Sequence, residues 1–159
     1  MRRNAALAVS LALLAIPAFT GALSAQESPI VGAWVTTSWE GQDGNAAPGL
    51  LVFTETHYSM MFTRPGMVRE QYTGETMTDT DIVAAFSTLV GNSGRYTRSG
   101  NEITTEAFVA MNPNYQASWG DNHVTYTFRV EGDTLHMSWP DEFMGPGIPG
   151  FTGTFRKVG

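Results

Sequence analysis

The clearest fold signal in this chain is the stretch from His123 to Trp139, which reads HVTYTFRVEGDTLHMSW. Large apolar side chains alternate with polar ones on both sides of Glu131-Gly132-Asp133. This period of two is typical of antiparallel strands with one buried face, and a short Gly-containing connection between them indicates a hairpin. The stretch therefore predicts a two-sided β-hairpin, and the rest of the chain can be compared with it.

The chain on either side of the hairpin continues in short runs of β-branched and aromatic residues separated by turn signals. The predicted strands are Val31–Trp39, Leu50–Thr54, Tyr58–Thr63, Gly94–Arg98, Glu102–Met111, His123–Val130, Thr134–Trp139 and Phe151–Val158. About eight strands at this spacing indicate an all-β antiparallel sandwich or barrel. An eight-stranded barrel has an interior that side chains fill or that holds one small ligand.

One segment breaks the strand pattern and predicts a short α-helix. Thr78 to Asp81 carries an N-cap signature with acidic residues in the first turn. An apolar face follows at helical spacing, made of Ile82, Val83, Phe86, Leu89 and Val90. Gly91-Asn92 is a C-cap signal. We expect this helix to plug one barrel end or to cover an open sheet edge.

The first 25 residues have the pattern of an export signal. Arg2 and Arg3 precede an apolar run from Leu7 to Ile16, and small residues follow. We expect cleavage after Ala25, with Ala22 as the alternative, so that residues 1–25 are the signal peptide and residues 26–159 form one domain. The protein is then periplasmic or secreted, with no integral membrane segment after cleavage. Because the chain has no cysteine, disulfides and a lipoprotein anchor are excluded.

Charge limits the partners of the mature chain. Removing 25 residues, two of them arginines, from the 159 leaves 134 residues with seven basic and fifteen acidic groups, a formal net charge of −8. Such a balance argues against binding to nucleic acid and against electrostatic docking on anionic lipid. The oligomeric state stays open.

Signals for catalysis or for a metal site are weak. His57, His123 and His136 lack the spacing of metal ligands, and the chain has no Gly-x-Ser-x-Gly elbow. His123 and His136 share the polar side of their hairpin and are surface histidines in the simplest interpretation. The pair Asp141-Glu142 can do acid–base work at a barrel mouth or be a solvated loop. We assign no catalytic residue, no metal and no cofactor.

The predicted dry faces supply the candidate ligand-binding residues. They are rich in phenols and flexible thioethers, which adapt to varied apolar ligands, and a buried tyrosine hydroxyl needs a polar partner. Plain core packing is the competing interpretation. The candidates are Tyr58, Met60, Phe62, Tyr96, Thr105, Tyr126, Phe128, Met137 and Trp139. Tyr115, Trp119 and Trp139 flank two loops and are expected around one opening of the barrel.

Several short motifs occur in a characteristic order. They are Gly32-Ala33-Trp34, residues 49–54, the helix from Asp79 to Val90 followed by Gly94-Arg95-Tyr96, residues 112–115, and residues 130–135. In this order and spacing they resemble the bacterial lipocalin-like domain family. The resemblance implies a small, closed or nearly closed antiparallel barrel with a central cavity. It also shows two departures, because members often have histidines at the positions of Thr105 and Glu106 and tryptophan at the position of Tyr115.

The resemblance also gives Gly32-Ala33-Trp34 a structural role, because lipocalins stack a basic side chain on the tryptophan of this motif. Arg156 and Lys157 are both available near the C-terminus. We favour arginine, since its planar guanidinium stacks better. Trp34 is then expected to seal one end of the barrel, Gly32 to allow a close approach of the chain, and the pocket to open at the other end.

Three functions remain open at this point. The first is an exported, non-catalytic lipocalin-like protein that binds a small, mostly apolar molecule in the barrel cavity. The second is a small barrel enzyme of isomerase or cyclase type, in which a tyrosine or a carboxylate acts as acid or base on a hydrophobic metabolite. The third is an interaction module of the cell envelope with a filled core. The size and the lining of the cavity separate the three.

Overall fold

The computed structural model of the chain describes residues 28–41, 47–71, 76–116 and 123–159. Its strands are β1 (Gly32–Trp39), β2 (Gly49–Phe53), β3 (His57–Thr63), β4 (Leu89–Ser99), β5 (Glu102–Ala110), β6 (His123–Glu131), β7 (Thr134–Trp139) and β8 (Phe151–Val158). The helices are α1 (Asp79–Ser87) and the 3-10 turn η1 (Pro113–Tyr115). The expected signal segment, residues 1–25, lies outside the described residues.

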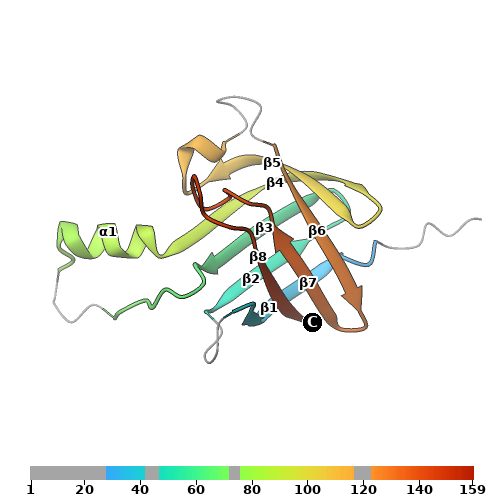
Figure 1. Cartoon of the computed structure of the whole chain (residues 1–159), viewed down its shortest axis with the longest axis horizontal. Coiled ribbons are helices and arrows are strands. Elements are labelled where there is room, and N and C mark those ends of the chain that lie inside the picture. The colour runs from blue at the N-terminus through green and yellow to red at the C-terminus, as the bar shows by residue number, and fades with distance from the viewer. Residues whose placement is uncertain (1–27, 42–46, 72–75, 117–122) are drawn as a thin grey trace, which may run out of the picture.

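The eight strands form one closed antiparallel barrel (Figure 1). Each strand pairs with its successor along the chain, and β8 pairs back onto β1 with Trp34 opposite Lys157. The hairpin of β6 and β7 has Phe128 opposite Met137 with both side chains facing inward, as the alternation predicts. The predicted all-β barrel with one helix between strands is thus confirmed, and the sandwich alternative is wrong.

Helix α1 begins where the sequence predicts and ends earlier. The Thr78 hydroxyl accepts from the Asp81 amide while the Asp81 carboxylate accepts from the Thr78 amide, a complete capping box. The C-cap, however, is Thr88 and not Gly91-Asn92. Leu89 and Val90 pair with β3 in the sheet. The cap signal at Gly91-Asn92 was misleading because long-range strand pairing overrides a local helical pattern.

The expected position of α1 is also wrong. The helix projects away from the barrel, in line with the start of β4 (Figure 1). Its apolar side chains stay open to solvent, with Ile82 50%, Val83 67% and Phe86 53% exposed. Because β8 pairs with β1, the described barrel has no free edge for a helix to cover. Only Thr88 separates the helix from β4, so the helix continues outward from the strand.

The barrel end at which β1 begins is closed around Trp34. This side chain is fully buried, and its Nε1 donates to the carbonyl of Ile30 at 2.8 Å. Lys157 Nζ lies 5.5 Å from the centre of the Trp34 ring. Gly32 has φ +143°, and a Cβ there would come 2.8 Å from Lys157 Cε. Trp34 and Gly32 therefore have the roles that the sequence predicts.

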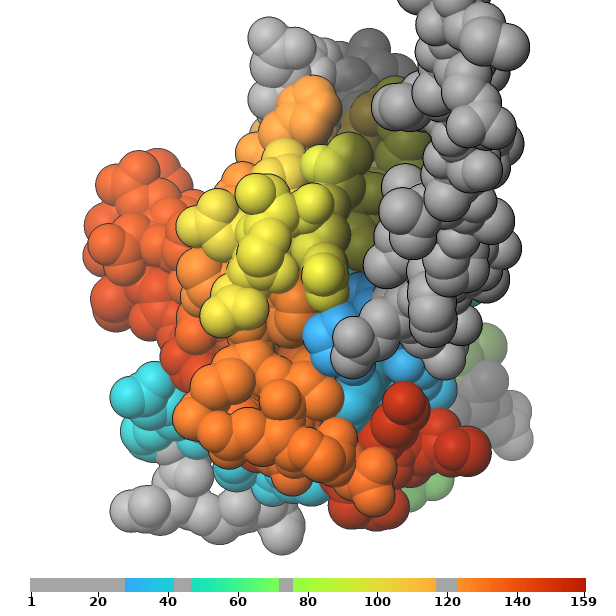
Figure 2. Space-filling model, turned by 90° about the vertical axis from the view of Figure 1, so that its right-hand side faces the viewer, coloured from blue at the N-terminus to red at the C-terminus, as the bar shows by residue number. Residues whose placement is uncertain are grey.

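The basic partner of Trp34 is lysine and not the favoured arginine. Lys157 is directly opposite Trp34 in the ladder, whereas Arg156 is opposite Val35 and points outward. Strand parity therefore decides the choice, because neighbouring residues on a strand face opposite sides. Figure 2 looks onto this closed end, where the yellow β4–β5 turn, the orange β6–β7 turn and the red C-terminus gather around the blue start of β1.

Aromatic rings fill the barrel toward its opposite end. Trp39 is the centre of this cluster, with ring-centre distances of 5.2 Å to Phe62, 5.6 Å to Trp139 and 5.5 Å to Phe155. Phe151 stacks on Trp139 at 5.0 Å with an interplanar angle of 7°. Edge-to-face and offset contacts of this kind stabilise a core beyond the area that they bury. This part of the interior is a packed aromatic core.

Candidate functional site

A pocket of about 250 Å³ lies at the open end of the barrel. Four segments that are far apart in sequence surround it, namely the end of β3, the junction of α1 with β4, the end of β5 with η1, and the β7–β8 loop (Figure 1). Its apolar walls are made of Phe86, Leu89, Val90, Met111, Phe143 and Met144. Polar residues supply almost half of the lining, so the pocket is concave like most small-molecule sites but less apolar than most; these residues are Arg64, Asn92, Asn112, Asn114, Tyr115 and Glu142.

Two of the polar groups in this pocket have no hydrogen-bond partner. Asn92 on β4 is 6% exposed, and its Oδ1 is buried without a bond. Arg64 lies directly after β3, and its Nε is also buried without a hydrogen-bond partner. Both side chains line the pocket, together with Tyr115 and Glu142. An unsatisfied buried polar atom costs stability in the empty protein, so these groups are free to bind something else.

Phe143 separates the pocket from the barrel interior. Its ring centre lies 5.3 Å from that of Tyr115, 5.9 Å from that of Tyr126 and 6.4 Å from that of Trp139. The side chain comes from the β7–β8 loop and is half-buried. On one side it lines the pocket, and on the other it packs on rings of the core.

Beneath Phe143 lies a group of buried phenols. The hydroxyls of Tyr58 and Tyr126 have no hydrogen-bond partner. The Thr105 hydroxyl lowers the pKa of both phenols, but it forms no hydrogen bond with either of them. Thr105 Oγ1 donates to the Val124 carbonyl at 3.2 Å instead. Burial dominates, raising the pKa of Tyr58 to about 12 and the pKa of Tyr126 well above its usual range. Both phenols are therefore neutral donors near neutral pH.

All nine ligand-binding candidates from the sequence are buried in the barrel wall or core. They are Tyr58, Met60, Phe62, Tyr96, Thr105, Tyr126, Phe128, Met137 and Trp139. None of them lines the pocket at the open end, although Met60 borders a shallow hollow on the outer wall. Tyr96 lies away from the other phenols and donates to the Thr54 carbonyl at 2.6 Å. That these residues bind a ligand stays a prediction.

The sequence placed other groups near the opening with mixed results. Tyr115 lines the pocket, whereas Trp139 is 2% exposed inside the core and Trp119 lies outside the described residues. Of the acidic pair, Glu142 lines the pocket with φ +62°, and Asp141 accepts the Gly150 amide at 2.7 Å.

Sequence reasoning missed the residues that contribute most to the pocket. These are Arg64, Phe86, Asn92, Phe143 and Met144. Most of them lie a few residues before or after a strand, where the alternation of a strand no longer predicts which way a side chain points. The one available signal was Asn92, a polar residue that strand parity places on the inner face of β4 once the strand is extended to Leu89.

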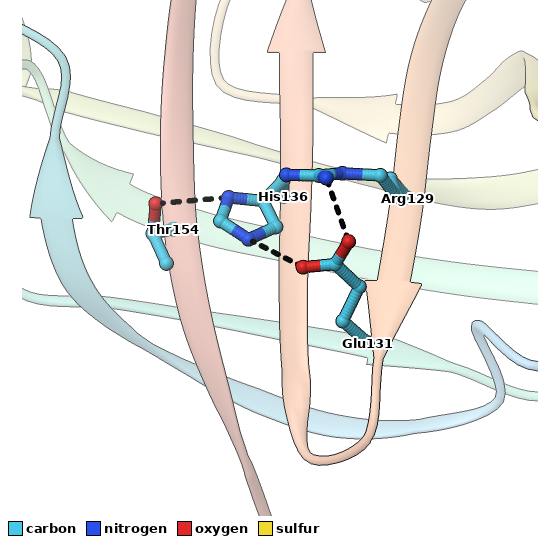
Figure 3. A network of polar contacts seen from close by, with 4 residues as sticks. All are labelled: Arg129, Glu131, His136 and Thr154. Carbon is cyan, nitrogen blue, oxygen red and sulfur yellow. Dashed lines mark hydrogen bonds and ion pairs between the residues drawn. The ribbon is translucent and has the colours of Figure 1, made fainter.

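The histidines lie on the outer wall. His136 on β7 has Nδ1 3.3 Å from Thr154 Oγ1 and Nε2 3.9 Å from Glu131, which also pairs with Arg129 at 2.6 Å (Figure 3). His123 is exposed and lies opposite Glu106 in the ladder of β5 and β6. Among the described residues, no three His, Asp or Glu side chains form a group that could hold a metal ion. No helix in the described part of the chain is long and apolar enough to span a membrane.

Comparisons with known proteins give similarity in overall structure alone. No family model and no curated protein matches the chain. A crystal structure of a lipocalin-like protein from Bacteroides uniformis is similar, with 15% identity, a TM-score of 0.43, and coverage of 82% of this chain and 100% of that one. An uncharacterized protein from Bacteroides eggerthii has 14% identity, a TM-score of 0.41, and coverage of 80% and 98%. The fold assignment rests on the closed strand ladder, and the two structures are what this chain resembles.

Proposed function

We propose that this protein is an exported, non-catalytic carrier that holds a small, largely apolar molecule at the open end of its barrel. The observation that carries the proposal is the pocket of about 250 Å³ between β3, β4, β5 and the β7–β8 loop, with its apolar wall residues. Its volume is slightly below the usual range of about 300–1,000 Å³ for small-molecule pockets. The ligand is therefore small.

Contrast with the barrel core supports the location. The rings around Trp39 pack on one another at 5.2–5.7 Å. At the mouth, by contrast, Arg64 and Asn92 line the pocket and each keeps a buried polar atom without a hydrogen-bond partner. We infer that the ligand stops at Phe143, which lines the pocket and packs on the core ring of Tyr126.

Native mass spectrometry of protein purified from its own host tests the proposal directly. We expect a co-purified small molecule, and a rise in melting temperature when apolar compounds are added, because a ligand that binds only the folded state stabilises it. No bound mass together with no thermal shift across an apolar library would contradict the carrier proposal.

A matched pair of substitutions locates the site. Ala110→Trp puts an indole into the pocket lining and should abolish binding of the neutral probe N-phenyl-1-naphthylamine. Val109→Trp is the control, since Val109 is the next residue on β5, is 58% exposed and does not line the pocket. Equal binding by both variants would place the ligand elsewhere.

A second candidate, the isomerase or cyclase, is favoured by one observation. Glu142 and Tyr115 line the same pocket, so a carboxylate and a phenol both face the bound molecule. Burial raises the pKa of Tyr115 above its usual value, which makes this phenol a hydrogen-bond donor more than a base. A chemical change in the bound molecule that Glu142→Gln stops would favour the enzyme over the carrier.

Export is the part of the proposal that rests on residues 1–25. Amino-terminal sequencing of protein recovered from the periplasm or the medium should begin at Gln26, or at Leu23 if cleavage follows Ala22. Recovery of uncleaved chain from the cytoplasm alone would contradict it.

A further inference from the structure

The open-end pocket contains an arginine that forms no ion pair with any described residue. Arg64 lines the pocket, is half-buried, and has its Nε buried without a hydrogen-bond partner. The ion pairs between described residues involve Arg95, Arg129 and His136 on the outer wall, and none includes Arg64. A partly desolvated guanidinium without a counter-ion is costly, and it is the side chain best shaped to bind a carboxylate.

The backbone at Arg64 is held in place. Its amide donates to the Thr88 carbonyl at 3.0 Å, and its carbonyl accepts from the Met67 amide at 3.0 Å. The first bond ties the end of β3 to Thr88, the residue that caps α1, and the second closes a turn between Arg64 and Met67. The guanidinium is therefore presented to the pocket from a fixed point, which reduces the entropy lost when it binds a ligand.

Asn92 supplies a second, independent observation. Its side chain is 94% buried, makes no hydrogen bond within the described chain, and lines the pocket from the inner face of β4. A buried amide with nothing to bind is expensive. Asn92 Nδ2 can donate to one oxygen of a carboxylate whose other oxygen is held by a guanidinium, whereas the orphaned Oδ1 needs a donor on the ligand or a water.

The walls and the remaining charge define the rest of the ligand. Phe86, Leu89 and Phe143 offer only apolar surface, so the body of the ligand is apolar. Glu142, the one acidic group among the described lining residues, is exposed and accepts from the Gly147 amide at 3.4 Å. Its negative charge disfavours a second anionic group on the ligand.

We infer that the pocket binds an apolar monocarboxylate, with the carboxylate held by Arg64 and Asn92 and the apolar body lying against Phe86, Leu89 and Phe143. This inference rests on the proposed carrier function and names its ligand class. Neither neutral hydrocarbons nor dianions such as phosphate monoesters are then the preferred ligand.

Calorimetric titration with octanoate and with its neutral isostere octanamide tests the inference at a pH where octanoate is ionised. We expect octanoate to bind the wild-type protein at least about tenfold more tightly than octanamide, because hydrogen bonds to charged groups are the stronger ones. Arg64→Gln should remove this preference, because it weakens octanoate binding far more than octanamide binding. Arg64→Lys, which keeps the charge and loses the planar fork, should fall between the two.

Two further variants make the result specific. Arg129→Gln removes a 60%-exposed arginine from the outer wall and should leave both affinities unchanged. Glu142→Gln should keep or strengthen octanoate binding, the opposite sign from Arg64→Gln. Melting curves of each variant confirm that it is folded.

The outcomes separate this inference from the carrier proposal. If N-phenyl-1-naphthylamine binds but octanoate shows no preference over octanamide, the carboxylate inference is overturned and the carrier stands. The same holds if Arg64→Gln, still folded, keeps the preference. If neither octanoate nor the neutral probe binds, both fall together.

Discussion

The two ends of this barrel use similar side chains in opposite ways. At the closed end the polar atoms of buried aromatics are paired, as Trp34 Nε1 is with Ile30 and the Tyr96 hydroxyl is with Thr54. Toward the open end, the hydroxyls of Tyr58 and Tyr126 and the Asn92 amide oxygen are buried without partners. Hydrogen-bonded polar groups stabilise the empty protein, whereas buried polar groups without a partner lower its stability until something binds them. The paired groups make the closed end a stabilising part of the empty protein, and the orphaned groups support the proposed position of the ligand at the open end.

Removing the ring at the closed end should have the largest effect. Trp34→Ala is expected to lower the free energy of unfolding by about 3–5 kcal/mol, because it deletes a fully buried indole and leaves a cavity. Urea denaturation measures the loss. An unchanged urea midpoint would show that Trp34 does not seal the barrel, and the closed end would then not be the stabilising end.

The next effect concerns the backbone beneath that ring. Gly32→Ala should cost about 2–3 kcal/mol, since φ +143° is a conformation that residues with a Cβ avoid. Gly132→Ala is the control, with φ +59° in a turn and nothing within 4 Å of its Cβ position, and should cost about 1 kcal/mol. Thermal melts of the two variants give the ratio, and equal losses would argue against a close approach at Gly32.

Alkaline titration examines the phenols toward the open end. The pKa of Tyr58 is raised from 10.0 to about 12 in the folded protein, so its contribution is fully present below pH 10 and is lost as the pH rises to about 12. Stability should fall across this window by on the order of 2 kcal/mol more in the wild-type protein than in Tyr58→Phe. Denaturation at several pH values measures the slope, and identical slopes would show that the phenol is solvated.

The smallest effects have opposite signs at the two ends. Tyr96→Phe removes a hydroxyl that donates at 2.6 Å and should destabilise the empty protein by about 1 kcal/mol. Tyr126→Phe removes a buried hydroxyl without a partner and should be neutral or stabilising by up to about 1 kcal/mol. A loss of stability in both variants would mean that Tyr126 has a water partner and that the contrast between the ends is weaker.

Much of the fold could be predicted because strand signals are local. Thr134–Trp139 and Phe151–Val158 were predicted with the observed ends, since alternation and turn residues bound them on both sides. The end of α1 could not be, because Leu89 and Val90 fit a helical face equally well. Their pairing with Thr63 and Phe62 is a long-range property that no local window contains.

The pocket was harder to predict for a related reason. Strand parity reports which residues face inward, and all nine candidates do lie inside. It does not report whether the interior is filled, and here the rings of Trp39, Phe62 and Trp139 occupy it. The open space is formed by residues such as Arg64 and Phe143, which lie just beyond strand ends, and tertiary packing alone brings them together.

The pairing of β8 with β1 affects which sequence changes this fold tolerates. Exposed strand edges recruit other strands and lead to aggregation, so most β-sheet proteins must protect them. A barrel whose described strands are all paired on both sides needs no such protection. The connections at its open end can lengthen, shorten or change composition without uncovering an edge, so the residues that line the pocket can change while the ladder stays the same.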